Sequence, residues 1–208
     1  MSTLIEHDLA LNRPLIGVDE VGRGALAGPV YSAAVHFDLK NKNLLNYAHL
    51  VNDSKKIKIK LRQQISLELK QFCTFGIGQA SCEEINQLGI LPSTLLSMLR
   101  AIDQVTKLKK KEYLVLIDGI SQIKELAFEQ KTLKKGDSLS WHIAAASIIA
   151  KTARDEFMQN LANLPEYAPF AWHKNVGYGT LAHRLALLEH GSTIQHRTKF
   201  IRKIFKNV

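Results

Sequence analysis

Cysteine is scarce in this sequence and long hydrophobic runs are missing, and both absences exclude classes of protein. The 208 residues include two cysteines, Cys73 and Cys82, too few for a small secreted fold held by several disulfides, so a reducing compartment is expected. No stretch approaches the roughly 20 apolar residues of a membrane helix. The first residues lack the basic segment followed by an apolar one that marks a secretory signal. We therefore expect a cytoplasmic protein without a membrane segment.

Two nucleotide-binding motifs are missing as well. The pattern G-x-x-x-x-G-K-[ST] is absent, which excludes a P-loop NTPase. A glycine-rich segment at residues 22–28 follows an apolar run, but its third glycine falls one position late for the dinucleotide pattern G-x-G-x-x-G. Pro29 and the β-branched residues after it also argue against a helix there. The segment is therefore expected to be a turn that lets the backbone approach a ligand closely.

Positive charge is abundant and unevenly distributed. Lysine and arginine outnumber the acidic residues, 28 to 19, which gives a formal net charge of +9. From residue 172 to the end, seven basic residues and one acidic residue leave an excess of six positive charges. Aromatic and histidine side chains are interleaved with them, a mixture that suits contacts to phosphates, sugars and bases. The charge predicts a polyanionic partner, either a nucleic acid or an anionic surface.

The pattern of apolar residues predicts one α/β domain over residues 1–208, with a basic helical part from about 172 to 208. No internal repeat, low-complexity linker or abrupt change of composition divides the chain. Apolar runs predict strands over residues 14–20, 30–37, 75–80 and 113–117. Helical spacing and terminal residues predict helices over residues 57–72, from 81, and over 92–108, 139–161, 180–189 and 196–205.

Carboxylates follow the ends of two predicted strands. Asp19 and Glu20 end the first apolar run and Asp118 follows the fourth, at the edge where open α/β sheets bind ligands. A fourth acid, Asp137, precedes the long helix and could instead be its N-cap, just as Asp118 with Gly119 could form an ordinary turn. Because neighbouring strand residues point to opposite faces, Asp19 and Glu20 can share one site only if the strand bends or ends there.

If these acids gather at one edge, they repel one another unless cations neutralise them. Hard oxygen ligands suit Mg²⁺ or Mn²⁺ rather than Zn²⁺. A pair of such ions about 4 Å apart is a common arrangement for displacement at phosphate. The acids therefore predict a metal-dependent reaction on a phosphodiester.

The glycine-rich segment also carries a family resemblance. Residues 17–30, G-V-D-E-V-G-R-G-A-L-A-G-P-V, resemble the opening signature of bacterial ribonuclease HII, the type 2 ribonuclease H. The resemblance spans roughly residues 15–202. Further segments agree in order: N-D-S-K-K at 52–56, I-D-G at 117–119, K-G-D at 135–137, A-A-A-S-I-I-A-K-T-A-R-D-E-F-M at 144–158, G-Y-G-T at 177–180, and then His183, His196, Arg197 and Phe200.

The resemblance implies a ribonuclease H-like fold, with a mixed five-stranded sheet flanked by helices and a helical C-terminal segment. It implies an endonuclease that hydrolyses the RNA strand of RNA–DNA hybrids. The same family incises DNA duplexes on the 5′ side of a single embedded ribonucleotide, leaving a 3′-hydroxyl and a 5′-phosphate. Its catalytic, metal-binding acids, which hold two Mn²⁺ or Mg²⁺ ions, map onto Asp19, Glu20, Asp118 and Asp137.

The resemblance also implies substrate-binding residues. The turn formed by Gly22, Arg23 and Gly24 reads the ribose 2′-OH, which separates RNA from DNA in any base context. Tyr178 packs against the adjacent sugar. We expect a monomer, with Asp155 structural. Further substrate contacts are expected from Ser54, Lys55, Ser147 and Lys151.

Five positions depart from the family pattern, and two other functions stay open. The departures put peripheral phosphate contacts and local helix packing in doubt, not the chemistry. The residues alone also allow a non-catalytic nucleic-acid binding module, or another metal nuclease on the same fold. The departures are Asn86, Gly89, Val176, Lys199 and Arg202.

Overall fold

The computed structural model describes residues 3–38, 51, 58–108 and 112–205. Two predicted substrate-binding residues, Ser54 and Lys55, lie outside the described residues. The strands are β1 (Leu15–Val21), β2 (Val30–His36), β3 (Thr74–Ala80), β4 (Leu114–Asp118) and β5 (Glu129–Leu133). The helices are α1 (Thr3–Ala10), α2 (Ile59–Phe72), α3 (Cys82–Leu88), α4 (Ile90–Leu108), α5 (Trp141–Ala162), α6 (Trp172–Asn175), α7 (Leu181–His190) and α8 (Thr198–Phe205), with 3₁₀ helices η3 (Gly136–Ser138) and η4 (Pro165–Phe170).

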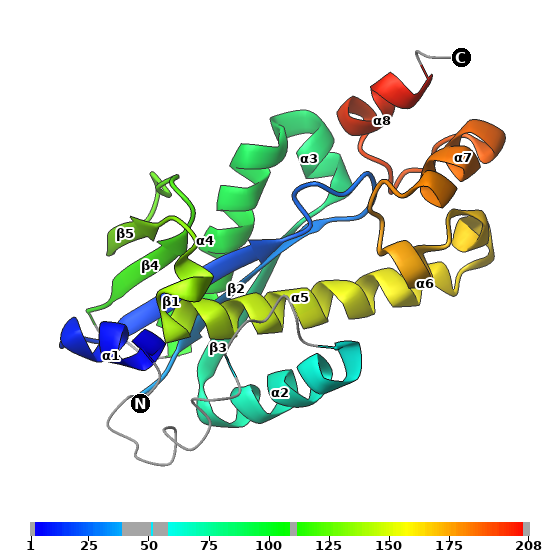
Figure 1. Cartoon of the computed structure of the whole chain (residues 1–208). Helices are drawn as coiled ribbons and strands as arrows, with labels where there is room; N and C mark the ends of the chain where they lie inside the picture. Colours follow the sequence, from blue (N-terminus) through cyan, green and yellow to red (C-terminus); the bar gives the residue numbers. More distant parts are fainter. Residues whose placement is uncertain (1–2, 39–50, 52–57, 109–111, 206–208) are drawn as a thin grey trace.

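A five-stranded mixed sheet lies at the centre of the fold, as the resemblance predicts. Its strand order is β3-β2-β1-β4-β5 (Figure 1). Strand β2 runs antiparallel to β1 and β3, whereas β4 runs parallel to β1 and β5. Val18 of β1 lies beside Ile117 of β4. The residues that follow them, Asp19 and Asp118, therefore arrive at the same edge of the sheet.

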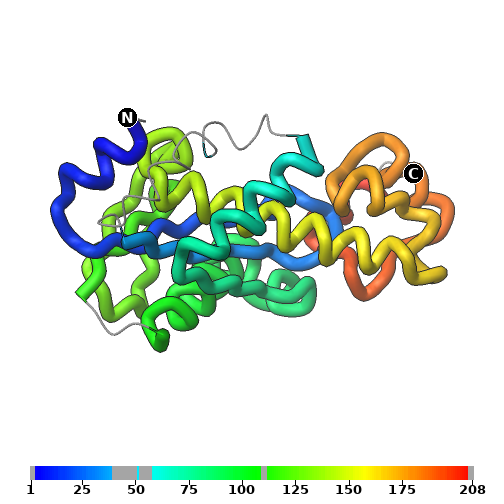
Figure 2. The backbone as a smooth tube through the Cα atoms, turned by 90° about the horizontal axis from the view of Figure 1, so that it is seen from below, coloured from blue at the N-terminus to red at the C-terminus, as the bar shows by residue number. Residues whose placement is uncertain are grey.

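Helices cover both faces of this sheet. Ala33 and Val35 of β2 belong to the apolar cluster formed with α5, while Ala34 between them belongs to the cluster formed with α4. This alternation follows from the opposite directions of successive strand side chains. Helix α5 runs lengthwise along β1 and β2, and α2 packs beside α5 (Figure 2).

Gly17 allows α5 to lie directly on β1. A Cβ atom at this position would stand 2.3 Å from the backbone carbonyl carbon of His142, so no larger residue fits without moving the helix. The close packing brings the face of α5 that carries Ser147 alongside the strand that carries Asp19. The close packing of α5 on β1 thus fixes the distance between Ser147 and Asp19.

The C-terminal elements η4, α6, α7 and α8 gather at one end of the sheet (Figure 1). Their shared apolar cluster contains the fully buried ring of Trp172 and also Ala27 from the glycine-rich segment. A single β-bridge between Ala27 and His196 joins that segment to the end of the chain. The basic C-terminal part is therefore packed against the predicted ligand-binding turn.

Several elements differ from the predictions. Helix α1, strand β5 and the η4–α6 segment carry no strong apolar signal, and α4 begins at Ile90 rather than at Pro92. The long helix begins at Trp141, and its N-cap is Ser140, whose side chain accepts a hydrogen bond from the Ile143 amide. The capping role considered for Asp137 is therefore wrong. Among the described helices, none has the length and apolar character to cross a membrane.

Candidate active site

Three of the four predicted acids meet at the edge of the sheet. Asp19, Glu20 and Asp118 each offer a carboxylate oxygen within 4.8 Å of the others. The Asp19 carboxylate folds back to accept the Glu20 amide, 2.7 Å from Oδ1, although the strand continues to Val21. Asp118 Oδ1 accepts the Gly136 amide at 2.6 Å. Backbone amides thus orient two of the three carboxylates.

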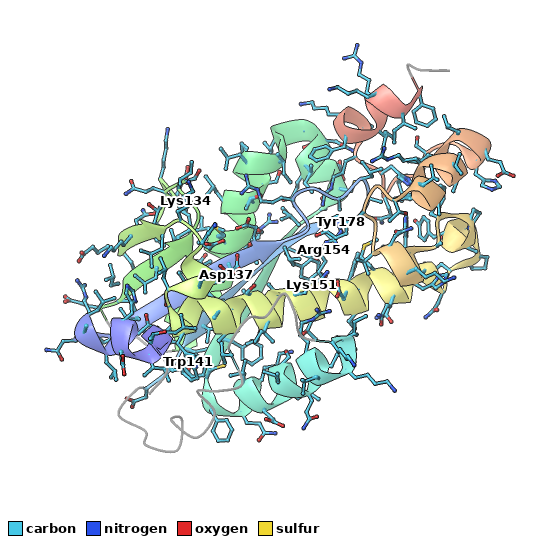
Figure 3. All side chains as sticks on the ribbon, viewed as in Figure 1. Lys134, Asp137, Trp141, Lys151, Arg154 and Tyr178 are labelled. Atoms are coloured by element: carbon cyan, nitrogen blue, oxygen red, sulfur yellow. The ribbon has the colours of Figure 1, made fainter. Side chains whose placement is uncertain are left out.

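Asp137 stands next to this cluster without joining it. It lies in η3, directly after the glycine whose amide holds Asp118. Ser138 Oγ is 3.5 Å from Asp137 Oδ1. The label of Asp137 in Figure 3 marks its place at the approach to α5. The structure therefore brings Asp137 to the neighbourhood of the acids but outside the group of three.

Burial and mutual repulsion dominate the electrostatics of the cluster. Burial raises the pKa of Asp19 well above its usual value, the negative charges of Glu20 and Asp118 raise it further, and a hydrogen bond from Ser147 opposes the rise. Burial also raises the pKa of Glu20, against the positive charge of Arg23, whose Nη1 lies 3.3 Å from Glu20 Oε1. Three crowded carboxylates with only oxygen donors fit a hard divalent cation, which would relieve this repulsion.

The acids form one wall of a pocket of about 430 Å³. Residues 22–24 border it beside the acids, and Tyr178 borders it from the segment before α7. Ser147 and Lys151 line the pocket from α5, and Arg62 lines it from α2. The pocket therefore places a cluster of acids that fits a metal ion beside a glycine turn, an aromatic ring and three cationic residues, Arg23, Arg62 and Lys151.

Two buried arginines hold the glycine-rich segment from behind. Arg154 donates from Nε to the Pro29 carbonyl at 3.0 Å and from Nη2 to the Ala27 carbonyl at 3.1 Å. Arg197 donates from Nη1 to the Arg23 carbonyl at 2.9 Å and from Nη2 to the Gly28 carbonyl at 2.8 Å. Burial, and then the charge of Arg154, lowers the pKa of Arg197 to about 10. Both guanidiniums thus donate hydrogen bonds to the carbonyls of this segment and fix its backbone conformation.

Glycine is required at position 22 because the Arg154 side chain packs directly against its Cα. Its φ is +94°, and a Cβ atom there would stand 2.2 Å from Arg154 Nε. The conformation of the turn and the position of the arginine therefore depend on each other.

Tyr178 is held between cations and a histidine. The Lys151 ammonium and the Arg154 guanidinium lie 5.6 Å and 5.4 Å from the centre of its ring. His183 Nδ1 lies 3.0 Å from the Tyr178 carbonyl oxygen, which can only accept, so this nitrogen carries the proton. The neighbouring Arg154 is labelled with Lys151 and Tyr178 in Figure 3, where the three side chains converge above α5.

Comparison with known proteins identifies the family. The family model described as Ribonuclease HII matches residues 16–208. The chain belongs to the ribonuclease HII family. A ribonuclease HII of Wolbachia sp. subsp. Brugia malayi (strain TRS) is 47% identical over 190 residues, covering 91% of this chain and 89% of the relative. This ribonuclease is therefore a metal-dependent endoribonuclease, consistent with the cluster of Asp19, Glu20 and Asp118.

Solved structures show the same fold. A chain of the PCNA:RNase HII complex from Archaeoglobus fulgidus matches with a TM-score of 0.72 at 21% identity, covering 90% of this chain and 95% of that one. Bst-RNase HIII in complex with Mn²⁺ matches with a TM-score of 0.72 at 19% identity, covering 100% of this chain and 74% of that one. The ribonuclease H-like architecture expected from the sequence is confirmed.

One charged residue of the pocket, Arg62, has no counterpart among the predicted site residues. Arg62 lies on the buried face of α2 together with Ile65, Ser66 and Leu69. A charged residue three positions before a buried isoleucine was a visible signal, because an arginine on an apolar face needs a partner. That partner is Asp155, which was expected to be structural.

The departures from the family pattern fall on joints between helices. Asn86 of α3 accepts the Thr198 amide at 2.9 Å and so ties α3 to the start of α8. Gly89 ends α3 with φ +89°. Val176 adopts φ +43°, and its carbonyl accepts Arg154 Nη1 at 2.9 Å. Lys199 and Arg202 are exposed on α8. These positions affect local packing and surface charge and leave the acids untouched.

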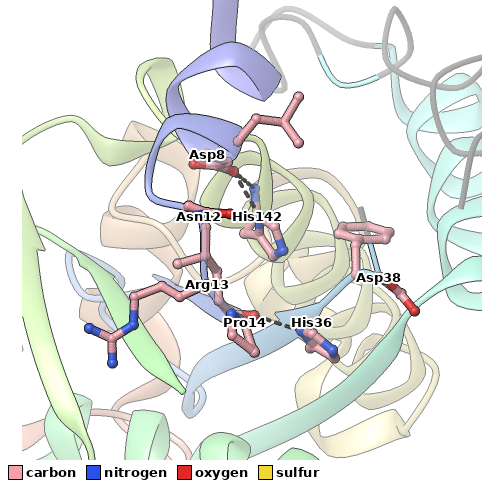
Figure 4. Close-up of a pocket in the computed structure, with 10 residues that line it drawn as sticks. Asp8, Asn12, Arg13, Pro14, His36, Asp38 and His142 are labelled. Carbon is pink, nitrogen blue, oxygen red and sulfur yellow. Dashed lines mark hydrogen bonds and ion pairs between the residues drawn. The ribbon is translucent and has the colours of Figure 1, made fainter. Parts of the chain in front are cut away.

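A second pocket, of about 350 Å³, lies at the opposite end of β1 (Figure 4). There Asp8 of α1 accepts His142 Nδ1 at 2.8 Å and Ser140 Oγ at 3.1 Å. Hydrogen bonds lower the pKa of Asp8 although its burial acts in the other direction. This buried pair fastens α1 to the first turn of α5, far along the strand from the acids.

Proposed function

We propose that this ribonuclease hydrolyses the RNA strand of RNA–DNA hybrids and incises DNA duplexes on the 5′ side of a single embedded ribonucleotide. The observation that carries the proposal is the cluster of Asp19, Glu20 and Asp118 in one pocket with the turn at residues 22–24. A non-catalytic binding module gains nothing from three carboxylates facing a polyanion, so the acids favour the enzyme.

The proposed cofactors are two Mn²⁺ or Mg²⁺ ions. Asp19, Glu20 and Asp118 would hold them through carboxylate oxygens, and we propose that Asp137, which follows the glycine bonded to Asp118, completes the ligand set. Divalent ions in such a site supply an activated water and neutralise charge on the phosphate. The Mn²⁺ complex of Bst-RNase HIII supports the choice of metal for the shared fold.

The protein's own groups position the substrate around that chemistry. The Ser147 hydroxyl and the Glu20 amide both hydrogen-bond the Asp19 carboxylate and hold it beside Glu20 and Asp118. Arg23 pairs with Glu20 from the turn and places a positive charge at the mouth of the pocket. The proposed products are a 3′-hydroxyl and a 5′-phosphate.

Recognition of the ribonucleotide is assigned to the turn and to Tyr178. Residues 25–28 donate their amides to backbone carbonyls, and the arginines take up carbonyls of the same segment. The segment is therefore rigid, and its pocket-lining part, Gly22, Arg23 and Gly24, can test for a 2′-OH by close backbone approach. The Tyr178 ring, fixed over Lys151, offers a face to the neighbouring sugar.

We further propose that the enzyme acts as a monomeric single catalytic domain in the cytoplasm. Both cysteines are free, which suits a reducing compartment. Light scattering of the eluted peak in size-exclusion chromatography tests the oligomeric state.

A cleavage assay on a labelled RNA–DNA hybrid tests the catalytic assignment. Asp118→Asn keeps the size of the side chain and removes the charge, so we expect cleavage to fall at least 100-fold, about 2.7 kcal/mol of barrier, while hybrid binding persists. Asp103→Asn, at an exposed position on helix α4, is the matched control and should cleave like the wild type. Full activity of Asp118→Asn would refute the metal assignment.

A further inference from the structure

Arg62 is a nearly buried cation in the wall of the active-site pocket. It lies on α2, and 7% of its surface is exposed. It shares the pocket with Lys151 of α5 and with the three acids. Burying an arginine is costly unless its charge is compensated, so its presence here needs a reason.

Asp155 provides only part of that compensation. Its Oδ2 accepts Arg62 Nη2 at 2.7 Å, and its Oδ1 accepts Lys151 Nζ at 2.7 Å. Two cations therefore share one carboxylate, and this group keeps one positive charge in excess. A purely structural ion pair between α2 and α5 would need one cation.

The guanidinium of Arg62 also keeps unused donors. Within the described residues, Nη2 is the nitrogen of Arg62 that has a protein acceptor, and Nε is buried with none. Arginine carries five N–H donors in a planar fork that matches a phosphate group. An acceptor from outside the chain would complete the set.

The spacing along α5 indicates which acceptor. Ser147, Lys151 and Asp155 recur every four residues on one face of the helix, so successive members lie about 6 Å apart along its axis. Ser147 contacts the metal-binding Asp19. The cation pair therefore lies one helical turn beyond the acids, and a ligand that reaches both must carry a reacting phosphate and another negative group close to it.

We propose that Arg62 and Lys151, oriented by Asp155, bind a backbone phosphate next to the scissile one. This inference rests on the proposed function, because it takes the ligand to be the cleaved nucleic-acid strand. Arg62 and Lys151 are binding residues in this assignment, and Asp155 is a positioning residue that holds both cations toward the pocket.

The salt dependence of binding tests this role, since a structural ion pair would not change it. Anisotropy of a labelled RNA–DNA hybrid in EDTA gives the binding constant over a range of salt. Each phosphate contact contributes about 0.9 to the slope of log K against log salt concentration. We expect Arg62→Met to bind roughly tenfold more weakly and to lose about one unit of that slope.

Arg13→Met is the matched control. Arg13 is also paired with a carboxylate at 2.7 Å, that of Glu129, but it precedes β1 at the end opposite to the acids. Its slope should equal that of the wild type. A wild-type slope for a folded Arg62→Met would overturn the inference.

A second variant keeps the inference testable if Arg62→Met does not fold. Arg62→Met removes one of the two cations that neutralise the buried Asp155 carboxylate, and this loss could unfold the protein. Arg62→Met combined with Asp155→Leu replaces the buried ion pair by an apolar pair, an exchange that proteins often tolerate. It should also lose about one unit of slope, and an unchanged slope would again overturn the assignment. Hybrid cleavage by the wild type is measured in parallel. If the wild type cleaves the hybrid but the variants keep the wild-type salt slope, only this inference is refuted. If the wild type does not cleave the hybrid, the proposed function itself is refuted.

Discussion

At the scale of single residues, Asp19 shows the electrostatics of the proposed metal site most clearly. The sheet edge buries it beside two other acids, and its pKa rises because burial and those charges both oppose ionisation. The cluster thus stores repulsion that a divalent cation can relieve. A site of this kind binds metal at the expense of stability in the metal-free protein.

Metal should therefore stabilise the fold. At a free Mn²⁺ concentration of about 100 times Kd, mass action adds about 2.7 kcal/mol to the free energy of unfolding, or roughly 5–10 °C in Tm. Differential scanning fluorimetry with and without Mn²⁺ measures the shift. Asp118→Asn should lose most of it and Asp103→Asn should keep it; equal shifts in both variants would contradict the metal site.

At the scale of elements, the turn at residues 22–28 depends on helices far along the chain. Arg154 of α5 and Arg197, just before α8, bind its carbonyls, and Gly22 leaves room for the first of them. The shape of the turn is thus a property of three segments together.

Gly22→Ala should disturb both the turn and its support. The positive φ costs about 1–3 kcal/mol for a residue with a Cβ, and that Cβ would also displace Arg154. Gly89→Ala is the matched control, because its φ of +89° is similar and nothing lies within 4 Å of its added Cβ. We expect both variants to lower the free energy of unfolding, because both impose a positive φ on alanine. Only Gly22→Ala should lose cleavage at single ribonucleotides more than cleavage of continuous hybrids. Equal loss on both substrates would argue against recognition by the turn.

The same dependence explains which elements the sequence could predict. The apolar runs of β1, β2, β4 and α5 are long enough to predict these elements from the local sequence. Asp19, Glu20 and Asp118 could be predicted as site residues because they lie at the ends of β1 and β4. β5, E-Q-K-T-L, is polar and forms by pairing with β4, while α1 is fastened by the buried pair of Asp8 and His142. The apolar face of α2 shows that Arg62 needs a partner, but the identity of that partner depends on the packing of α2 against α5, which no local pattern records.

Across the whole molecule, a histidine network couples the C-terminal part to the pocket. His183 Nε2 accepts Trp172 Nε1 at 3.2 Å and lies 3.1 Å from His196 Nε2, while His196 Nδ1 accepts the Thr193 amide at 2.9 Å. With a proton on His183 Nδ1 and another on His196 Nε2, every one of these hydrogen bonds has one donor and one acceptor while both rings are neutral. Burial, and then His183, lowers the pKa of His196 to about 4, and burial lowers that of His183.

Acid should therefore destabilise the enzyme in a defined window. Because the folded-state pKa of His196 lies below the unfolded value of 6.5, the unfolded chain binds more protons between pH 6.5 and about 4. The free energy of unfolding should fall as pH drops through that window. Urea unfolding at several pH values measures the slope, which His196→Asn should flatten and the exposed His190→Asn should not. A slope unchanged in His196→Asn would contradict the assignment.

At the scale of the whole molecule, positive charge surrounds an acidic pocket. The net charge of +9 includes the three acids gathered in the pocket, so the surface around them is more positive than the total indicates. This basic surface favours a polyanionic duplex, and we propose that the acids and the turn determine which bond is cut.

The most direct test is a duplex that contains one ribonucleotide in an otherwise all-DNA labelled strand. With Mn²⁺ or Mg²⁺, we expect one cut on the 5′ side of the ribonucleotide, a 3′-hydroxyl on the labelled product, and no cut in the all-DNA duplex. Cleavage of both duplexes, or of neither while the ribonucleotide duplex is bound, would contradict the proposed function.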